Sequence, residues 1–301
     1  MCMEAIIAKG LAKKYRNGVW GARDVTFVAN SHGITVLLGP NGAGKTTTVK
    51  MLTTLLKPTK GYGLVLGFDV VKEVWEVRKR IALCPQDVSV DINWTPWEAV
   101  KGFLIARGWC ISDAESEAKR WLEELELWDI RSWLIAHLSG GQRKRVAVAM
   151  ALASSADVLF LDEPTSGLDV EGKYRVWKAL RTTVRNGSSI LLTTHDMKEA
   201  EINSDKVVFI HRGKVIAEGA VEDLVSKVPY PYKVIAKNVK DFPLEVDGSR
   251  VLSLEDRLII YAKSKSEALA LMSEVNAEHL SLSRVGLEDT YLHLIREREG
   301  D

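Results

Sequence analysis

The strongest constraint on the fold of this 301-residue chain is a glycine-rich segment between a short apolar run and a helical pattern. Residues 39–46 read Gly-Pro-Asn-Gly-Ala-Gly-Lys-Thr and fit the pattern GxxxxGK followed by Ser or Thr. Glycines let backbone N–H groups wrap around phosphate oxygens, where side chains would block the approach. The helical pattern over residues 46–56 would aim its positive N-terminus at the same phosphates. The segment therefore predicts a strand–loop–helix unit that binds ATP or GTP.

Two side chains at the end of this segment are suited to phosphate chemistry. Lys45 would supply a positive charge to the β- and γ-phosphates, and the Thr46 hydroxyl is placed for Mg²⁺. We therefore expect Lys45 to bind the nucleotide and assist its reaction, and Thr46 to be a metal ligand.

Short apolar runs rich in β-branched residues recur through the first two thirds of the chain. Bounded by Gly, Pro, Asp or His, they span residues 34–38, 81–84, 158–161, 190–194 and 207–210. Helical patterns lie between most of these runs, which is typical of a largely parallel sheet that is buried on both faces. Residues 94–137 carry helix-like stretches without a strand signal, so a helical subdomain is expected to interrupt the α/β domain at about residues 87–140.

Composition narrows the classes of protein to which this chain can belong. Hydrophobic residues make up 46% of it and its net charge is 41 − 40 = +1, which argues against disorder and against a protein that coats nucleic acid or anionic lipid. No apolar stretch approaches the ~18–20 residues that a bilayer-spanning helix needs, and the N-terminus does not resemble a signal peptide. Three cysteines without CxxC spacing fit a reduced, cytosolic chain. A membrane process would therefore require another chain to cross the membrane.

The alternation of strand-like runs and helical patterns is interrupted again near residue 229, which indicates a separate C-terminal domain. Pro229 and Pro231 cannot continue a helix and indicate a linker, so a domain boundary is expected after residue 228. Beyond it, strand-like runs and helical patterns alternate. The strand-like runs span residues 232–237, 251–254, 258–262 and 280–284, and the helical patterns span 266–275 and 287–296. The sequence thus predicts an α/β domain over residues 1–228 and a small α+β domain over residues 229–301.

Polar side chains follow three of the predicted strands at the point where each strand ends. Gln86 comes closely after the second run, Asp162 and Glu163 directly after the third, and His195 directly after the fourth. Ligands of parallel sheets bind beyond the carboxyl ends of the strands. Asp162 is suited to the Mg²⁺ shell and Glu163 to polarising an attacking water, while capping of the next turn is the alternative role for both.

A second glycine-rich segment precedes another helical pattern. Residues 138–142 read Leu-Ser-Gly-Gly-Gln, and a helical run follows over residues 143–153. A helix N-terminus opened by glycines suits a phosphate, and the Ser139 hydroxyl adds a donor. Because residues 39–46 already form one phosphate cradle, the second anion site indicates a second molecule.

In this order, the motifs resemble those of the ATP-binding subunits of ABC transporters, and the match is dense over about residues 15–219. Residues 39–47 look like the Walker A motif, Gln86 like the Q-loop, residues 138–142 like the signature, residues 158–164 like Walker B, residues 166–169 like the D-loop and His195 like the switch histidine. The resemblance implies a P-loop NTPase fold of α/β class. Such a fold has a mostly parallel sheet with an antiparallel β subdomain and an inserted helical subdomain. The resemblance also implies that the chain binds ATP and Mg²⁺.

The resemblance implies a role for each matching residue. Glu163, His195 and Lys45 are expected to be catalytic, and Thr46, Gln86 and Asp162 are expected to hold the metal. Tyr15 is expected to stack on adenine, with ordinary packing as the alternative. The residues expected to bind nucleotide are Tyr15, Gly39, Asn41, Gly42, Gly44, Lys45, Thr46, Thr47, Ser139, Gly140, Gly141 and Gln142.

The resemblance also implies an assembly. Two cassettes would pair head to tail, each ATP lying between the Walker A motif of one chain and the signature of the other, which accounts for the second anion site. The pair is either a homodimer or a heterodimer. A separate membrane-spanning permease would hold the pair at the cytoplasmic face of the membrane.

Two classes of ABC protein compete at this point: the motor of a transporter, and a soluble ABC ATPase that acts on nucleic acid. A single cassette without a heptad run or a basic cluster favours the transporter and no nucleic-acid partner. Residues 285–292, Val-Gly-Leu-Glu-Asp-Thr-Tyr-Leu, are similar to the endings of drug- and antibiotic-export ATPases. Export is therefore favoured over branched-chain amino-acid import.

Six of the nine tryptophans fall between residues 94 and 133. Trp94 and Trp97 follow the Q-loop, where the family docks its permease, so they either contact that partner or belong to the core of the helical subdomain. For Trp121, Trp128 and Trp133 a place in that core is favoured.

Overall fold

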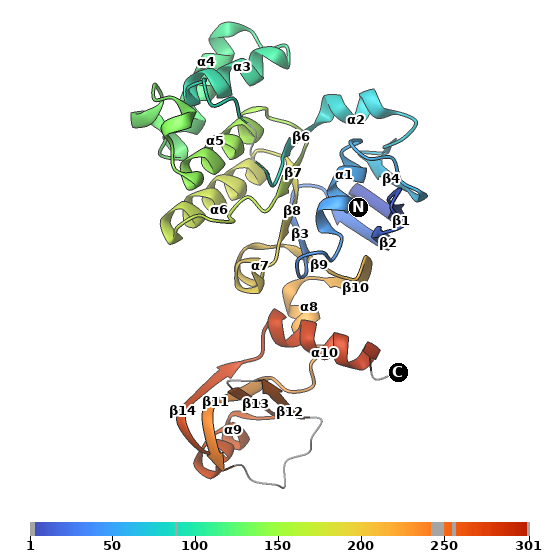
Figure 1. The fold of residues 1–301 in the computed structure, drawn as a ribbon, viewed down its shortest axis with the longest axis vertical. Coiled ribbons are helices and arrows are strands. Elements are labelled where there is room, and N and C mark those ends of the chain that lie inside the picture. The colour runs from blue at the N-terminus through green and yellow to red at the C-terminus, as the bar shows by residue number, and fades with distance from the viewer. Residues whose placement is uncertain (1–3, 88–89, 242–249, 255–256, 300–301) are drawn as a thin grey trace. The chain divides into compact units, whose positions relative to one another are not determined.

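The computed structural model of the chain describes residues 4–87, 90–241, 250–254 and 257–299. The chain divides into two compact units, Met1–Gly219 and Ala220–Asp301, each with its own sheet (Figure 1). The boundary expected after residue 228 therefore lies within the second unit. The reason is that Val225 and Val228 pack against side chains of the second unit.

The first unit is built on a sheet whose described strands number ten, in the order β5-β4-β1-β2-β10-β9-β3-β8-β7-β6. Five neighbouring strands run parallel: β9 (Lys206–His211), β3 (Ile34–Leu38), β8 (Ser189–Thr194), β7 (Val158–Asp162) and β6 (Ile81–Cys84). They confirm the five apolar runs of the sequence, and β3, β7 and β8 are buried throughout. This arrangement brings the carboxyl ends of the strands to one edge of the sheet.

The remaining strands extend the sheet as an antiparallel arm. They are β1 (Glu4–Lys14), β2 (Trp20–Asn30), β4 (Lys60–Val65), β5 (Phe68–Asp69) and β10 (Lys214–Gly219). β1 pairs antiparallel with β2 and β4, and β4 pairs antiparallel with β5. β10 joins this arm to the parallel strands, because it pairs in parallel with β2 and antiparallel with β9. The arm is the antiparallel subdomain that the family resemblance implied.

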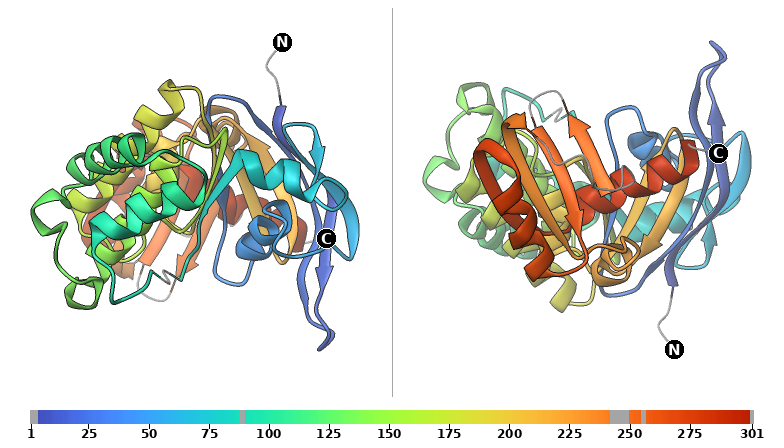
Figure 2. Two further views of the ribbon diagram at one scale, coloured as in Figure 1. Left: turned by 90° about the horizontal axis from the view of Figure 1, so that it is seen from above. Right: turned by 90° about the horizontal axis from the view of Figure 1, so that it is seen from below.

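Helices pack on this sheet and form the inserted subdomain. α1 (Lys45–Leu52) follows β3, α2 (Val74–Arg80) precedes β6, α6 (Val170–Arg185) follows β7 and α7 (Met197–Asn203) follows β8. Between β6 and β7 stand α3 (Pro96–Ala106), α4 (Ile111–Glu124) and α5 (Gly140–Ala153), which Figures 1 and 2 show grouped together. These three helices contact one another and confirm the helical subdomain.

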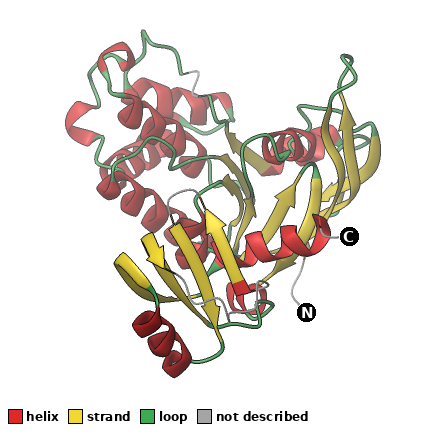
Figure 3. Ribbon diagram, turned by 60° about the horizontal axis from the view of Figure 1, so that its bottom comes forward, coloured by secondary structure: helices red, strands yellow, loops and turns green. Residues whose placement is uncertain are grey.

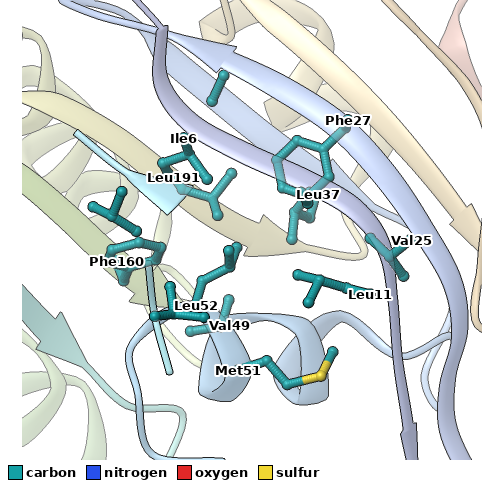
Figure 4. Packing of buried hydrophobic residues seen from close by; sticks show 14 of the residues in the cluster. Ile6, Leu11, Val25, Phe27, Leu37, Val49, Met51, Leu52, Phe160 and Leu191 are labelled. Atoms are coloured by element: carbon teal, nitrogen blue, oxygen red, sulfur yellow. The ribbon is translucent and has the colours of Figure 1, made fainter. Parts of the chain in front are cut away.

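A buried apolar cluster fixes α1 against the sheet (Figure 4). Phe27 of β2, Leu37 of β3 and Phe160 of β7 pack in it with Val49 and Leu52 of α1. Burying a side chain of this size stabilises the fold by ~1.5–3 kcal/mol relative to exposure. The loop over residues 39–44 is therefore held between two packed elements, β3 and α1.

In its described residues, the second unit is a four-stranded antiparallel sheet with helices on both faces (Figure 3). The strand order is β12-β13-β11-β14, with bounds β11 (Tyr232–Asp241), β12 (Val251–Leu254), β13 (Arg257–Ala262) and β14 (Asn276–Arg284). α9 (Lys265–Glu274) packs on one face, and α8 (Val221–Val225) and α10 (Leu287–Glu299) pack on the other. This confirms the α+β character expected of the C-terminal part of the chain.

The two faces of this small sheet follow from the alternation of side chains along its strands. Val234 and Ile260 pack into the cluster beneath α9, whereas Ile235 and Tyr261 pack into the cluster beneath α10. Because successive side chains of a strand point to opposite faces, consecutive apolar residues supply two cores at once.

Asp289, in the segment that resembles export ATPases, ties α10 to this sheet. Its carboxylate is 2% exposed and accepts hydrogen bonds from Lys233 Nζ at 2.6 Å, from the backbone N–H of Gly286 at 2.9 Å and from Tyr261 Oη at 3.1 Å. Burial raises the pKa of the Tyr261 hydroxyl, so it remains a donor. The motif is therefore a structural anchor of the second unit.

The sequence predicts reduced cysteines and no bilayer-spanning segment. Cys84 is buried and Cys110 is exposed, whereas Cys2 lies outside the described residues. Burial raises the pKa of the Cys84 thiol to about 11, so this thiol stays protonated at neutral pH. No helix in the described part of the chain is long and apolar enough to cross a bilayer.

Candidate active site

A pocket of about 360 Å³ lies at the carboxyl ends of the parallel strands. The loop after β3 and the start of α1 form one wall, residues following β6 and β7 form another, and Val19, Trp20 and Gly21 complete it. The pocket brings together eight of the residues singled out in the sequence: Asn41, Gly42, Gly44, Lys45, Thr46, Thr47, Gln86 and Glu163.

The loop over residues 39–44 has a shape that requires glycine at two positions. A Cβ atom at Gly39 would lie 2.1 Å from the carbonyl oxygen of Ile210. At Gly44, where φ is +105°, a Cβ atom would lie 2.6 Å from the carbonyl oxygen of Gly21. Gly44 also caps α1 without a side-chain hydrogen bond, so the first N–H groups of the helix face the loop. The cradle therefore fits phosphate oxygens.

Lys45 is the buried cation of this pocket. Its side chain is 5% exposed, and its Nζ donates to the carbonyl oxygens of Gly39 at 2.8 Å and Pro40 at 3.1 Å. Burial lowers the pKa of Lys45, while the carboxylates of Glu163 and Asp162 oppose that effect. The ammonium is thus held over the loop where phosphates would lie.

Thr193, on the strand next to β7, bonds the carboxylate of Asp162 and the backbone of Glu163 in the Walker B segment. The Thr193 hydroxyl donates to Asp162 Oδ1 and accepts from the backbone N–H of Glu163 at 3.0 Å. Asp162 and Thr193 are paired in the register of the parallel strands β7 and β8. Glu163 then turns the chain with φ +50°, a left-handed conformation uncommon outside glycine. The two carboxylates consequently leave the strand in different directions.

Glu163 Oε1 is close to nitrogen atoms of two other residues of the site. It is 3.2 Å from His195 Nδ1 and 3.9 Å from Lys45 Nζ. The Glu163 side chain is 8% exposed, whereas that of His195 is 52% exposed. Three residues expected to be catalytic, which lie far apart in the sequence, are therefore neighbours in space.

Tyr15 lies next to the pocket without lining it. Its hydroxyl is 3.2 Å from Thr47 Oγ1, and the residue is 37% exposed. Close packing of its ring also leaves no room for a Cβ atom at Gly21, which would lie 2.5 Å from Tyr15 Cε2. Stacking of Tyr15 on adenine stays a prediction.

The signature residues form the N-terminus of α5 and do not line this pocket. The Ser139 hydroxyl accepts from the backbone N–H of Gln142 at 3.1 Å, and Gln142 Oε1 accepts from the backbone N–H of Ser139 at 2.9 Å. This reciprocal pair is a capping box. A Cβ atom at Gly140 would meet nothing within 4 Å, so this helix end is open.

Glu199 of α7 links the loop after β7 to the loop that carries His195. Its Oε2 accepts from Thr165 Oγ1 at 2.6 Å and from Trp177 Nε1 at 3.0 Å. Its Oε1 lies 2.6 Å from Lys173 Nζ, which is also 3.4 Å from Asp196 Oδ2. The hydrogen bond to Glu199 raises the pKa of Lys173, which favours the charged form of this lysine.

Sequence reasoning missed several residues at this edge. Thr193, Val19, Trp20 and Glu199 lack a phosphate motif of their own. The register of neighbouring strands could have identified Thr193, because parallel strands that end together place their last residues side by side. The others depend on how distant segments pack, which no local pattern reports.

Comparison with known proteins agrees with this geometry. Residues 22–166 match the family described as ABC transporter. The chain is 34% identical to the daunorubicin/doxorubicin resistance ATP-binding protein DrrA of Streptomyces peucetius, over 96% of this chain and 92% of that protein. It is 37% identical to the Nod factor export ATP-binding protein I of Burkholderia lata, over 75% and 71% of the two chains.

Solved structures show the same fold. A structure described as the ATP-binding subunit of an ABC transporter superposes with a TM-score of 0.68 at 28% identity, covering 74% of this chain and 92% of its own. A second, described as the dimeric post-hydrolysis state of the ATP-binding cassette MJ0796 bound to ADP and phosphate, superposes with a TM-score of 0.67 at 24% identity, over 71% and 98% of the two chains. From its motifs, its fold and its relatives, this chain belongs to the family of ATP-hydrolysing, ATP-binding subunits of ABC transporters.

Proposed function

We propose that this chain is the ATPase motor of an exporter and works as one half of a head-to-tail pair around two ATP molecules. The observation that carries the pairing is the separation of the signature from the phosphate loop: residues 139–142 form an open helix end, and none of them lines the pocket at residues 41–47. A second chain would complete each site. The direction of transport is supported by the relatives, which are ATP-binding proteins named for drug resistance and for Nod factor export.

Residues that line the pocket and residues beside it have different roles in the hydrolysis of ATP. The loop N–H groups and Lys45 bind the phosphates, and Glu163 takes a proton from the water that attacks the γ-phosphorus as the bond to ADP breaks. His195, 3.2 Å from Glu163, orients that carboxylate. Oxygen donors of Thr46, Gln86 and Asp162 suit Mg²⁺, which would neutralise charge on the phosphates.

Replacing Ser139 tests the proposed pairing. Ser139→Ala removes the hydroxyl and should weaken ATP-dependent dimerisation by ~1.5–3 kcal/mol, roughly 10- to 150-fold, because a hydrogen bond to a charged phosphate is lost. ATP binding to the single chain should remain, since the pocket at residues 41–47 is intact. Light scattering with and without ATP, in a Glu163→Gln background, measures the dimer.

A second substitution separates the phosphate contact from the helix cap. Ser139→Asp keeps an acceptor for the backbone N–H of Gln142 and so preserves the cap, but it offers no donor to a phosphate. We expect Ser139→Asp to fail in dimerisation like Ser139→Ala while α5 keeps its stability. Dimerisation of either variant at the level of the parent protein would rule out the proposed sandwich.

An exposed apolar patch on the helical subdomain is the proposed docking surface for a permease. Ile92, Trp94, Trp133 and Leu134 are each more than 40% exposed. Their two segments are joined by hydrogen bonds from the backbone N–H of Ile135 to the Trp94 carbonyl at 2.8 Å and from that of Ala136 to the Ile92 carbonyl at 3.0 Å. The sequence favours a place in the core for Trp133, which is wrong: Trp133 is 54% exposed because it lies in the turn that follows residues 128–130.

Of the two tryptophans weighed for docking, Trp94 is the better placed. Trp97 packs edge-on against Trp128, with ring centroids 5.8 Å apart, and Lys101 lies over its face. Trp94 is 43% exposed. Permease docking would place the chain at the cytoplasmic face of the membrane.

Trp94→Ala should weaken association with the co-expressed permease by about 2 kcal/mol, roughly 30-fold, as expected for an aromatic anchor. The measurement is the amount of this chain that copurifies with tagged permease in detergent. Trp75→Ala is the matched control, because Trp75 is 71% exposed but lies on α2, outside this patch. If the parent chain, Trp94→Ala and Trp75→Ala copurified with the permease in equal amounts, docking at Trp94 would be refuted.

The second unit is proposed to be dispensable for ATP binding. All residues that line the pocket precede residue 164, so a chain ending at Gly219 should fold and bind ATP with an affinity near that of the full chain. A chain ending at Val228 should be less soluble than the chain ending at Gly219, because it retains Val225 and Val228 without the other apolar side chains that pack against them. Isothermal titration with ATP and circular dichroism compare the two. Failure of the shorter chain to fold would show that the units depend on each other.

A further inference from the structure

Lys144 is a buried lysine that the hydrolysis scheme does not use. It lies in the second turn of α5, the helix that begins with the signature, and is 6% exposed. Its Nζ donates to the carbonyl oxygens of Gln86 at 3.0 Å, Pro85 at 3.4 Å and Asp162 at 3.4 Å. An ammonium has three protons to donate, and here three backbone carbonyls accept them. Three hydrogen bonds therefore fix the position of this amine.

The three carbonyls belong to the ends of two neighbouring strands. β6 and β7 run parallel, with Cys84 paired to Leu161, so the residues that follow them lie side by side at the edge of the sheet. Two of these residues, Gln86 and Asp162, are the ones whose side chains are proposed to hold Mg²⁺. Lys144, which belongs to α5 of the helical subdomain, thus donates hydrogen bonds to the backbone carbonyls of both residues.

We infer that Lys144 is a positioning residue that couples the signature helix to the Q-loop and to the end of β7. Lys144 is five residues from Ser139 along one continuous helix, a rise of ~7.5 Å. A displacement of the helix N-terminus therefore reaches the backbone of Gln86 and Asp162 through one side chain. In the pairing proposed above, on which this part of the inference rests, nucleotide bound by the partner chain at the signature would set the geometry of this chain's own metal ligands.

The burial of Lys144 supports a purpose beyond packing. Taking an ammonium out of water costs several kcal/mol and is compensated only by good geometry, yet here the acceptors are neutral carbonyls. A methionine of similar length would fill the same space without that cost. The amine is therefore explained by the backbone carbonyls of Gln86 and Asp162 that its hydrogen bonds hold in place.

The test compares Lys144→Met, Lys144→Arg and Arg145→Met. Arg145 is the matched control, because it lies on the same helix and donates to a backbone carbonyl, that of Leu125, 2.9 Å away in the helical subdomain. For Lys144→Met we expect kcat for ATP to fall ~10- to 100-fold, the scale of a misplaced reacting group, with KM for ATP changed far less. Arg145→Met should retain kcat, and Lys144→Arg, which keeps charge and donors, should recover part of it.

A readout independent of turnover is the Mg²⁺ dependence of binding of a fluorescent ATP analogue. The Mg²⁺ concentration for half-maximal binding should rise ~10-fold or more in Lys144→Met, as for loss of a group that orients metal ligands, and stay unchanged in Arg145→Met. Thermal unfolding of each variant corrects for the folded fraction. Equal kcat and Mg²⁺ dependence in Lys144→Met and Arg145→Met would overturn the inference, as would a loss that only follows the unfolded fraction.

A third measurement separates this inference from the proposed pairing. Glu163→Gln and the double variant Glu163→Gln/Lys144→Met are compared for the ATP concentration at which they dimerise. Coupling predicts that the double variant needs more ATP than Glu163→Gln. If Glu163→Gln itself stays monomeric at saturating ATP, the sandwich proposal fails, while the Mg²⁺ and kcat measurements still decide whether Lys144 positions Gln86 and Asp162.

Discussion

Replacing Glu163 with Gln is expected to reduce ATP hydrolysis by ~10²-fold or more while ATP binding is retained, because the amide keeps the shape of the carboxylate but cannot accept a proton from water. The structure sharpens this expectation, because Glu163 Oε1 is only 3.2 Å from His195 Nδ1 and 3.9 Å from Lys45 Nζ. The amide can still accept a hydrogen bond from either neighbour. The variant should therefore stall with ATP bound.

Phosphate release under saturating ATP and equilibrium binding of ATP measure the two halves of this prediction. Glu171→Gln is the control, since Glu171 carries the same group at the start of α6, where its side chain is 72% exposed and pairs with Arg175. Near-normal turnover by purified Glu163→Gln would show that another group accepts the proton. A loss of ATP binding would assign Glu163 a role in holding the nucleotide.

Lys45→Ala is expected to have the largest effect on nucleotide binding. In the complex with ATP, Lys45 would pair with a phosphate, and removing one partner of a buried charge pair costs about 2–5 kcal/mol. This cost is roughly a 30- to several-thousand-fold loss of affinity for ATP. The free protein should not be destabilised comparably, because burial already lowers the pKa of Lys45 and so opposes its charged form. Affinity and stability are thus predicted to respond differently to the same substitution.

Isothermal titration with ATP and with ADP measures the affinity, and thermal unfolding without nucleotide measures the stability. Lys50→Ala is the control on the same helix, because Lys50 is exposed in the last turn of α1. ATP affinity of Lys45→Ala close to that of Lys50→Ala would mean that the loop N–H groups alone bind the phosphates. A large drop in unfolding temperature would instead make Lys45 a structural residue.

Much of the fold was predictable because the parallel strands are short, mostly apolar and bounded by glycine, proline or polar residues. The runs at residues 34–38 and 81–84 coincide with β3 and β6. The same patterning places Asp162, Glu163 and His195 at one sheet edge, since side chains that follow parallel strands must meet there. Strong local signals and one topological rule suffice for this part of the site.

What could not be predicted depends on contacts between segments far apart in the chain. The carbonyl partners of Lys144 lie 18 and more residues away, and nothing in the sequence around Lys144 marks it as more than one of three consecutive cations. The prolines at 229 and 231 suggested a boundary that lies too late, because Val225 and Val228 already pack with the second unit. Likewise, Trp97 is less exposed than Trp94 because Trp128 and Lys101, which lie far along the sequence or on the next helical turn, pack against its ring.

The capping box of α5 determines which hydrogen-bonding groups the signature can still offer. Ser139 uses its oxygen as an acceptor in that box, and Gln142 likewise uses its side-chain carbonyl oxygen. The hydroxyl proton of Ser139 and the amide protons of Gln142 are left over, and an anion can use only donors. A phosphate could therefore be received without breaking either bond of the cap. Recognition at this helix end would then require little loss of side-chain freedom, since both side chains are already held before the ligand arrives.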